Sequence, residues 1–269
     1  MAINALNSAA TGLRALSTRI DVIANNLANA ETTAFKRSRM NFEDLMYVTL
    51  KEPGSNNNAN EPSPAGTFVG LGVKISNTQL DLEQGPLENT NRPLDVAILG
   101  NGFFRVKIMD SVGDGTGYTR NGNFFQNRDG DLVLGMGDGY KLLPKINLPT
   151  DAHEISINQE GVIDYIRPGQ NTRTIAGQLK ISNFINPQGL KLLGGSIYVQ
   201  TEASGPPVDN KPGENGSGTI LQNFLEGSNV DPVKELVTLI KTQRSFELNS
   251  QSIQTADQAL QTIGNLRRF

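Results

Sequence analysis

The chain has 269 residues, enough for one compact domain or for two small domains with appended segments. Its formal net charge of −3 gives it no electrostatic reason to bind nucleic acid or acidic lipid. The sequence contains no Cys and a single His, His153, which excludes thiolate and multi-histidine metal sites, cysteine nucleophiles and disulfides.

The first residues lack the pattern of a secretory signal or of a membrane span. A signal peptide needs a basic start followed by a continuous apolar run. Residues 1–16, MAINALNSAATGLRAL, are instead interrupted by polar side chains. No stretch of the chain reaches the roughly 18 apolar residues of a membrane span. We therefore expect no membrane insertion and no cleaved export signal.

Residues 1–30 are predicted to form a helix. They contain no Pro and a single Gly. Apolar side chains recur every seven residues in two neighbouring rows, which is the spacing of a helical stripe that packs against another helix. The first row is Leu6, Leu13, Ile20 and Leu27, and the second is Ala9, Leu16 and Ile23.

Residues 31–66 are predicted to be extended. Within them, residues 51–66, KEPGSNNNANEPSPAG, combine three Pro with several Asn and Gly and have no apolar run. This composition is typical of a loop and not of a helix or strand.

Residues 67–227 are predicted to form an all-β domain. Short apolar runs alternate there with glycine-containing turns, as in residues 96–98, 103–106 and 132–134. Many short strands with glycine turns are typical of a sandwich or barrel-like domain. A segment of this length is long enough to bury a core.

Residues 228–269 are predicted to form a second long helix. Asp231 can cap its N-terminus, and Pro232 suits the first helical position. Its apolar positions again recur every seven residues, at Leu239, Phe246, Ile253 and Leu260. The predicted fold class is therefore α+β. Long N- and C-terminal helices form a coiled-coil pair, with an intervening all-β domain of short strands and an extended linker.

The other faces of the second helix carry few charges. Between residues 242 and 265 the charged side chains are Arg244, Glu247 and Asp257, and most others are small and uncharged. A solvated helix face normally carries many Lys and Glu. Two interpretations fit. The two helices close on each other with a plain polar exterior, or both pack laterally against copies of the chain in an open helical polymer.

Four segments resemble the rod and hook family of bacterial flagellar axial proteins. The terminal ones are residues 22–37, VIANNLANAETTAFKR, and residues 228–251, SNVDPVKELVTLIKTQRSFELNSQ. The central ones are residues 100–104, GNGFF, and residues 118–124, YTRNGNF. All four occur in the family's order and together they extend over essentially the whole chain. The resemblance implies a structural subunit, with no catalysis, no cofactor and no metal.

Within the family, the chain length and residues 47–64 favour the members that build the distal rod. Those members carry an insertion that is similar to YVTLKEPGSNNNANEPSP, and it is linked to a straight, stiff rod. The resemblance therefore implies that this segment stiffens the polymer by contacts with neighbouring subunits. The residues expected to do so are Tyr47, Pro53, Gly54, Pro62 and Pro64.

The resemblance also implies a location and a set of partners. Subunits would pass unfolded through the flagellar type III export apparatus and assemble in the periplasmic space. The product would be a hollow drive shaft that transmits torque from motor to hook and is a channel for exported subunits. The partners would be copies of the chain, proximal rod subunits, hook or hook-junction subunits, and the peptidoglycan-ring and outer-membrane-ring proteins as a bushing. The terminal helices would form the inner tube, and the all-β domain would face outward.

The helical stripes and the matching motif positions together predict the assembly contacts. The residues are Leu6, Leu13, Ile20, Asn25, Asn26, Leu27, Asn29, Phe35, Lys36, Arg37, Leu239, Gln243, Arg244, Phe246, Glu247, Asn249, Ile253 and Leu260. The three amides at positions 25, 26 and 29 either lie at a fraying helix end or bond to neighbouring subunits. The basic cluster at residues 36–39 contacts another subunit, pairs with carboxylates, or is a solvated turn.

One residue departs from the family's pattern. The family usually has Gly before Phe-Lys-Arg, and this chain has Ala34. If the position requires a positive φ, an alanine there is strained.

Three other motifs suggest chemistry but fit it poorly. Residues 100–102, Gly-Asn-Gly, lack the third glycine and the following helix of a dinucleotide loop, so a turn is favoured. Residues 127–131 alternate Asn and Asp as calcium loops do, but Leu132 and Asp138 stand where Gly and Glu are required. No nucleophile motif accompanies His153, which favours a surface histidine and no enzyme.

Two alternatives to a distal rod subunit stay open. One is a proximal rod or hook-like member of the same family, which polymer curvature would distinguish. The other is a multimeric secreted binding module whose β domain holds a ligand. A chain with five Tyr and no Trp has little material for an aromatic binding surface, which argues against the second alternative.

Overall fold

The structure is a computed structural model that describes residues 2–54, 64–109, 114–137, 139–169 and 172–266. The chain forms two compact units. The first consists of Met1–Ala28, Ser38–Gln79 and Asp231–Phe269, and the second of Asn29–Arg37 and Leu80–Val230. Each unit is therefore built from segments that lie far apart in the sequence.

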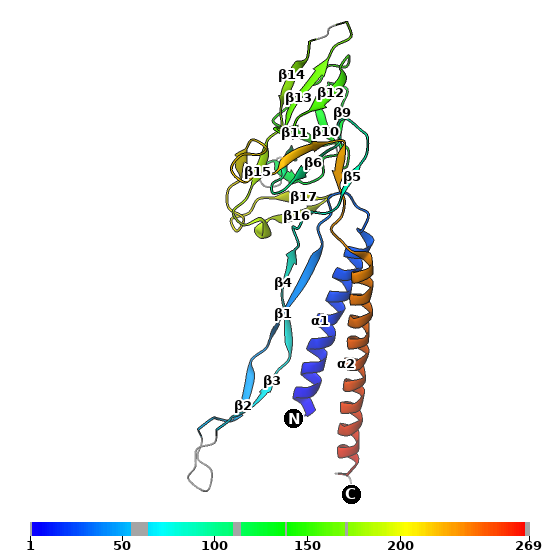
Figure 1. Ribbon diagram of the computed structural model, residues 1–269. Helices are drawn as coiled ribbons and strands as arrows, with labels where there is room; N and C mark the ends of the chain where they lie inside the picture. The colour runs from blue at the N-terminus through cyan, green and yellow to red at the C-terminus, as the bar shows by residue number, and fades with distance from the viewer. Residues whose placement is uncertain (1, 55–63, 110–113, 138, 170–171, 267–269) are drawn as a thin grey trace. The chain divides into compact units, whose positions relative to one another are not determined.

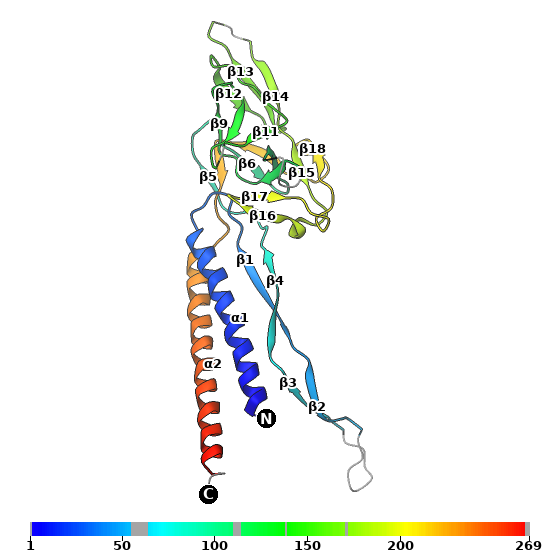
Figure 2. The same ribbon diagram turned by 180° about the vertical axis from the view of Figure 1, so that it is seen from behind.

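The first unit contains both helices, α1 (Ala2–Ala28) and α2 (Pro232–Leu266), side by side and running in opposite directions (Figures 1 and 2). A Cβ atom on Gly12 would lie 3.1 Å from Nδ2 of Asn249. Nδ2 of Asn26 lies 3.5 Å from Oε2 of Glu235. Between these contacts each helix advances by two heptads, from 12 to 26 and from 249 to 235. The spacing supports a heptad pairing, and knobs-into-holes coiled-coil packing stays a prediction.

Helix α2 begins where its sequence predicts. Oδ1 of Asp231 accepts hydrogen bonds from the backbone N–H of Val233 at 3.0 Å and of Lys234 at 3.2 Å. Pro232 takes the first helical position. Neither helix, over its described residues, is long and apolar enough to cross a membrane.

Two ribbons of two strands complete the first unit. Strand β1 (Ser38–Asp44) pairs with β4 (Val73–Leu80), and β2 (Tyr47–Lys51) pairs antiparallel with β3 (Thr67–Gly70). The linker predicted over residues 31–66 thus contains two strands. The β domain was expected to begin at residue 67, but β3 and most of β4 lie in the unit of the helices. The reason is that β3 pairs with β2 and β4 pairs with β1, and both partners lie in the linker.

The second unit is the β-rich domain. Its strands are β5 (Leu87–Asn89), β6 (Val96–Leu99), β7 (Phe104–Lys107), β8 (Thr116–Thr119), β9 (Phe124–Gln126), β10 (Leu132–Leu134), β11 (Lys141–Leu143), β12 (His153–Ile157), β13 (Val162–Ile166), β14 (Thr174–Gln178), β15 (Ile181–Asn183), β16 (Lys191–Gly194), β17 (Ile197–Val199), β18 (Val208–Asn210), β19 (Thr219–Gln222) and β20 (Phe224–Glu226). A short 3₁₀ helix, Pro187–Gly189, precedes β16.

The largest sheet of this domain has seven strands, in the order β16-β17-β8-β7-β11-β10-β9. Strands β12, β13 and β14 form a second sheet, and the pairs β15-β18, β19-β6 and β20-β5 complete the domain. The short strands and glycine turns of the sequence therefore do form a β domain.

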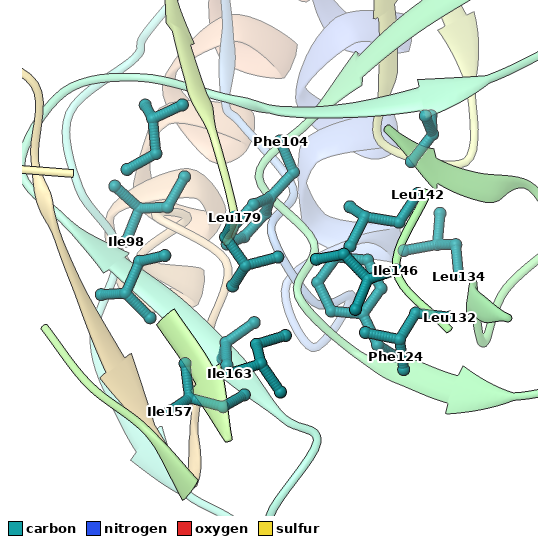
Figure 3. Close-up of a cluster of buried hydrophobic side chains, with 14 of the residues drawn as sticks. Ile98, Phe104, Phe124, Leu132, Leu134, Leu142, Ile146, Ile157, Ile163 and Leu179 are labelled. Atoms are coloured by element: carbon teal, nitrogen blue, oxygen red, sulfur yellow. The ribbon is translucent and has the colours of Figure 1, made fainter. Parts of the chain in front are cut away.

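A large cluster of buried apolar side chains forms the main core of this domain (Figure 3). Phe104, Leu134 and Leu142 come from the seven-stranded sheet, and Ile157 and Ile163 come from β12 and β13. The two sheets thus share one core. A smaller cluster contains an edge-to-face aromatic pair, with the rings of Tyr118 and Phe184 4.7 Å apart.

Candidate assembly surfaces and a buried ionic junction

The helix pair leaves large apolar side chains of α2 exposed. The exposed fraction is 69% for Val233, 56% for Ile240 and 63% for Leu248. Glu235 and Thr242 are buried, although each lies only two positions after an exposed residue, Val233 or Ile240. Helix α2 is therefore apolar on more faces than the one it buries, which is typical of a helix that packs on several sides.

The predicted assembly residues differ in how far they are exposed. The half-buried ones are Leu6, Leu13, Ile20, Leu27, Asn29, Phe35, Arg37, Leu239, Asn249, Ile253 and Leu260. The exposed ones are Asn25, Gln243, Arg244, Phe246 and Glu247. The helices approach each other at a small and a polar residue, Gly12 and Asn249. The apolar rows therefore keep part of their surface open.

Asn26 requires a correction, because it does not face a neighbouring subunit. It is buried, and its Nδ2 donates to the backbone oxygen of Ser38 at 2.9 Å. Its Oδ1 accepts from the backbone N–H of the same residue, also at 2.9 Å. Both polar groups of the amide are thus satisfied inside the chain, where they join α1 to the start of β1.

Lys36 requires the same correction. Its side chain is fully buried, and its Nζ lies 2.6 Å from Oε1 of Glu226. Nζ also donates to the backbone oxygen of Glu83 at 2.6 Å, and the same Oε1 accepts from the N–H of Gly85 at 3.0 Å. Of the interpretations of the basic cluster, the structure selects carboxylate pairing within the chain for Lys36.

Arg120 extends this ion pair into a network. Its Nη1 lies 3.5 Å from Oε2 of Glu226, and its Nη2 donates to the backbone oxygen of Gly100 at 2.6 Å. Burial lowers the pKa of both Arg120 and Lys36, because it disfavours their charged forms, while the charge of Glu226 opposes this effect. We call Lys36, Arg120 and Glu226 the ionic junction.

Further bonds join the segment after α1 to the segment before α2. The N–H of Ala34 donates to the backbone oxygen of Glu226 at 2.8 Å. The N–H of Arg37 donates to Oδ1 of Asn229 at 2.7 Å, and the guanidinium of Arg37 pairs with Asp81 at 2.9 Å. The second unit therefore holds both segments that lead into the helices.

Ala34 has the backbone conformation that its sequence context suggested. Its φ is +57°, and the residue is completely buried. Such a left-handed conformation is unfavourable for any residue with a Cβ atom. The position therefore does require the conformation that glycine adopts most easily.

The ionic junction could not be predicted from local sequence patterns. Glu226 lies 190 positions from Lys36 and was not a predicted site residue. Arg120 lies in the motif at residues 118–124, but no local pattern identified its partner.

The β2–β3 ribbon presents a second apolar surface. Met46, next to β2, is 80% exposed, and Phe68 on β3 is 53% exposed. The predicted stiffening residues Tyr47, Pro53, Gly54 and Pro64 are all exposed, and Pro62 lies outside the described residues.

The motifs that suggested chemistry are turns. Gly100 and Gly102, with φ values of +107° and +127°, lie between β6 and β7. Oδ1 of Asn127 accepts from the N–H of Asp129 and of Asp131, which closes the turn between β9 and β10. His153 is exposed at the start of β12.

The carboxylate of Asp131 is bound by side chains of the same chain, Asn147, Lys141 and Lys145. Hydrogen bonds from Asn147 and then from Lys141 and Lys145 lower the pKa of Asp131 to about 2. No group of three or more His, Cys, Asp or Glu side chains is placed to hold a metal ion in the part of the chain that the structure describes.

Three family descriptions match separate parts of the chain. "Flagella basal body rod protein" matches residues 6–36, "Flagellar hook protein FlgE/F/G D1 domain" matches residues 97–165, and "Flagellar basal body rod FlgEFG protein C-terminal" matches residues 221–266. The matched parts include most of α1, part of the β domain and all of α2.

Full-length relatives agree with these matches. The flagellar basal-body rod protein FlgG of Agrobacterium fabrum is 45% identical over 95% of this chain and 96% of its own length. Its counterpart in Buchnera aphidicola from Acyrthosiphon pisum is 43% identical, with the same coverage. That of Bacillus subtilis is 37% identical over 99% of this chain and 100% of its own length. The chain therefore belongs to the flagellar basal-body rod protein family.

Proposed function

We propose that the chain is a structural subunit of the flagellar distal rod, and not an enzyme. It polymerises with copies of itself and adjoins other rod and hook subunits. The observation that carries this proposal is the exposed apolar surface of α2. Exposed apolar area costs about 25 cal/mol per Å² relative to burial, so the helix pair is stabilised when neighbouring subunits cover that surface.

The helix pair forms the inner tube of the polymer. Residues 1–30 and 228–269 supply it, and they pack laterally through the half-buried rows around Leu13 and Leu239 and the exposed apolar residues of α2. Few charges occur on the remaining faces of α2, so several neighbours can approach without burying unpaired ions. The β domain faces outward.

The ribbon of β2 and β3 braces the tube. Its exposed apolar side chains, Met46 and Phe68 among them, become buried against adjacent subunits. Residues 47–64 thereby resist bending and keep the shaft straight.

The further partners follow from this role. Subunits leave the cytoplasm through the flagellar export apparatus and assemble in the periplasmic space. The finished shaft turns inside the peptidoglycan and outer-membrane rings, and its bore conducts the subunits that build the hook.

A paired substitution on α2 tests the proposal. Ile240→Gln combined with Leu248→Gln removes two exposed apolar side chains without touching the contact with α1 at Asn249. We expect this variant to fold but to assemble poorly, as measured by pelleting and electron microscopy. The matched control is Ile175→Gln with Ile185→Gln, two exposed residues of the β domain, which leaves assembly unchanged. Normal polymer from the α2 variant would contradict the role of this helix.

A further inference from the structure

We propose that one turn of α1 anchors the β2–β3 ribbon to the helix pair, and that this anchor is required for a straight polymer. The anchor consists of Ser8, Thr11 and Gly12 on α1, Gly70, Gly72 and Val73 at the turn between β3 and β4, and Asn249 on α2. The inference rests on the proposed function, because straightness is a property of the polymer.

Two hydrogen bonds hold the turn to the helix. Oγ of Ser8 donates to the backbone oxygen of Gly70 at 3.4 Å, and the backbone N–H of Val73 donates to Oγ1 of Thr11 at 3.3 Å. The hydroxyl of Thr11 also donates to the backbone oxygen of Ser8 at 2.9 Å, which orients its oxygen as an acceptor. The last residue of β3 and the first residue of β4 are thus both fastened to α1.

Gly72 brings the backbone of the turn directly against the helix. A Cβ atom at this position would lie 2.2 Å from Oγ1 of Thr11 and 3.2 Å from Cα of Ser8. The first distance is far below any contact that atoms tolerate, and the φ of Gly72 is +119°, a conformation that side chains disfavour. Only glycine therefore fits this contact without displacing the turn.

The next position on α1, Gly12, lies close to α2. Gly12 is buried, and a Cβ atom on it would lie 3.1 Å from Nδ2 of Asn249. One helical turn of α1 is therefore packed tightly against the ribbon through Thr11 and against α2 through Gly12. Because closely packed atoms transmit strain, a force that displaces the ribbon also displaces both helices.

The anchor gives the ribbon a resistance to bending that two strands alone do not have. A two-stranded ribbon is marginally stable when isolated, so it resists bending only if another element holds it. Its free surface is the apolar one that includes Met46 and Phe68, and its base is the turn at Gly72. We infer that loosening the base makes the shaft bendable even when residues 47–64 are intact.

The first test is Gly72→Ala in the full chain, with the persistence length of the polymer measured by electron microscopy. We expect loss of straightness, seen as a shorter persistence length than that of the unchanged chain. Gly194→Ala is the matched control, because Gly194 has a similar φ of +100° but nothing within 4 Å of an added Cβ. Polymers of Gly72→Ala as straight as those of the control would overturn the proposal.

A milder variant keeps the test decisive if Gly72→Ala does not assemble. Thr11→Val keeps the shape of the side chain but removes the acceptor for Val73, and Thr11→Ser retains the hydroxyl. We expect curved polymers and faster exchange of the Val73 amide from the first, and straight polymers from the second. Straight polymers from Thr11→Val, or loss of assembly by both Thr11→Val and Gly72→Ala, would contradict a role in stiffness. Failure of the unchanged chain to polymerise would instead contradict the proposed function.

Discussion

At position 34 a buried alanine takes a backbone conformation that favours glycine, and this leads to a prediction about stability. Ala34→Gly removes a left-handed penalty of about 1–2 kcal/mol, and the added freedom of the unfolded chain offsets roughly half of it. We expect the free energy of unfolding to rise by about 0.5–1 kcal/mol in chemical denaturation.

The control for this prediction is Ala97→Gly. Ala97 is as deeply buried, but it lies in strand β6 with an ordinary φ, so glycine there lowers stability. A loss of stability in Ala34→Gly as large as that in Ala97→Gly would show that position 34 carries no strain.

The ionic junction leads to a second prediction about stability, for a single buried carboxylate. Glu226→Gln leaves the buried ammonium of Lys36 without its carboxylate, which costs about 3–5 kcal/mol. Glu43→Gln breaks the exposed pair with Lys74 and is expected to change stability far less, because water screens exposed charges. Urea denaturation of both variants compares the two pairs, and equal losses would mean that the junction contributes no more than a surface ion pair.

These two positions also show how far single residues can be predicted from a sequence. The strain at Ala34 was predictable, because one substitution in a familiar motif changes the local backbone preference. The burial of Lys36 was not, because Glu226 joins it only through the tertiary fold. The partner of Asn26 is not predictable either, although Ser38 lies only twelve residues away, because the path of the chain between α1 and β1 has no local signal.

Among the elements, the start of α2 is the most accessible to experiment. The carboxylate of Asp231 accepts the N–H groups of Val233 and Lys234, and the bond from Lys234 is the main reason that its pKa is lowered. Asp231→Ala is therefore expected to speed amide exchange at positions 233 and 234 at neutral pH.

The pH dependence of this effect has a definite sign. A carboxyl group with a lowered pKa stabilises the folded state above the ordinary aspartate pKa of about 4, and this contribution is lost as pH falls further. The difference in protection between Asp231→Ala and the unchanged chain should thus shrink in acid. Asp257→Ala, in the interior of the same helix, should leave positions 233 and 234 unaffected at any pH; a matching change there would contradict a local cap.

The helices could be predicted because their signals are local. Heptad rows and an Asp-Pro start do not depend on the rest of the chain. Strands β1 and β4 were harder, because neither has a hairpin turn connecting it to its partner, and residues 45–72 separate them. The sequence pattern therefore predicts the boundary between linker and β domain at residue 67, whereas the second unit resumes at Leu80.

The stiffness of the whole polymer is expected to depend on the segment between β1 and β3. Deleting residues 47–64 removes β2 and leaves β3 without its partner. We expect the variant to polymerise through its helices but to form a bendable shaft, visible as curvature by electron microscopy. Unchanged straightness would assign the stiffness to another part of the subunit.

The central claim is that the helix pair builds the inside of a straight tube, and an electron cryomicroscopy reconstruction of the polymer grown from the purified chain tests it most directly. We expect a straight, hollow polymer in which α1 and α2 surround the bore and the β domain lies outside. A curved polymer, or a bore lined by the β domain, would contradict it.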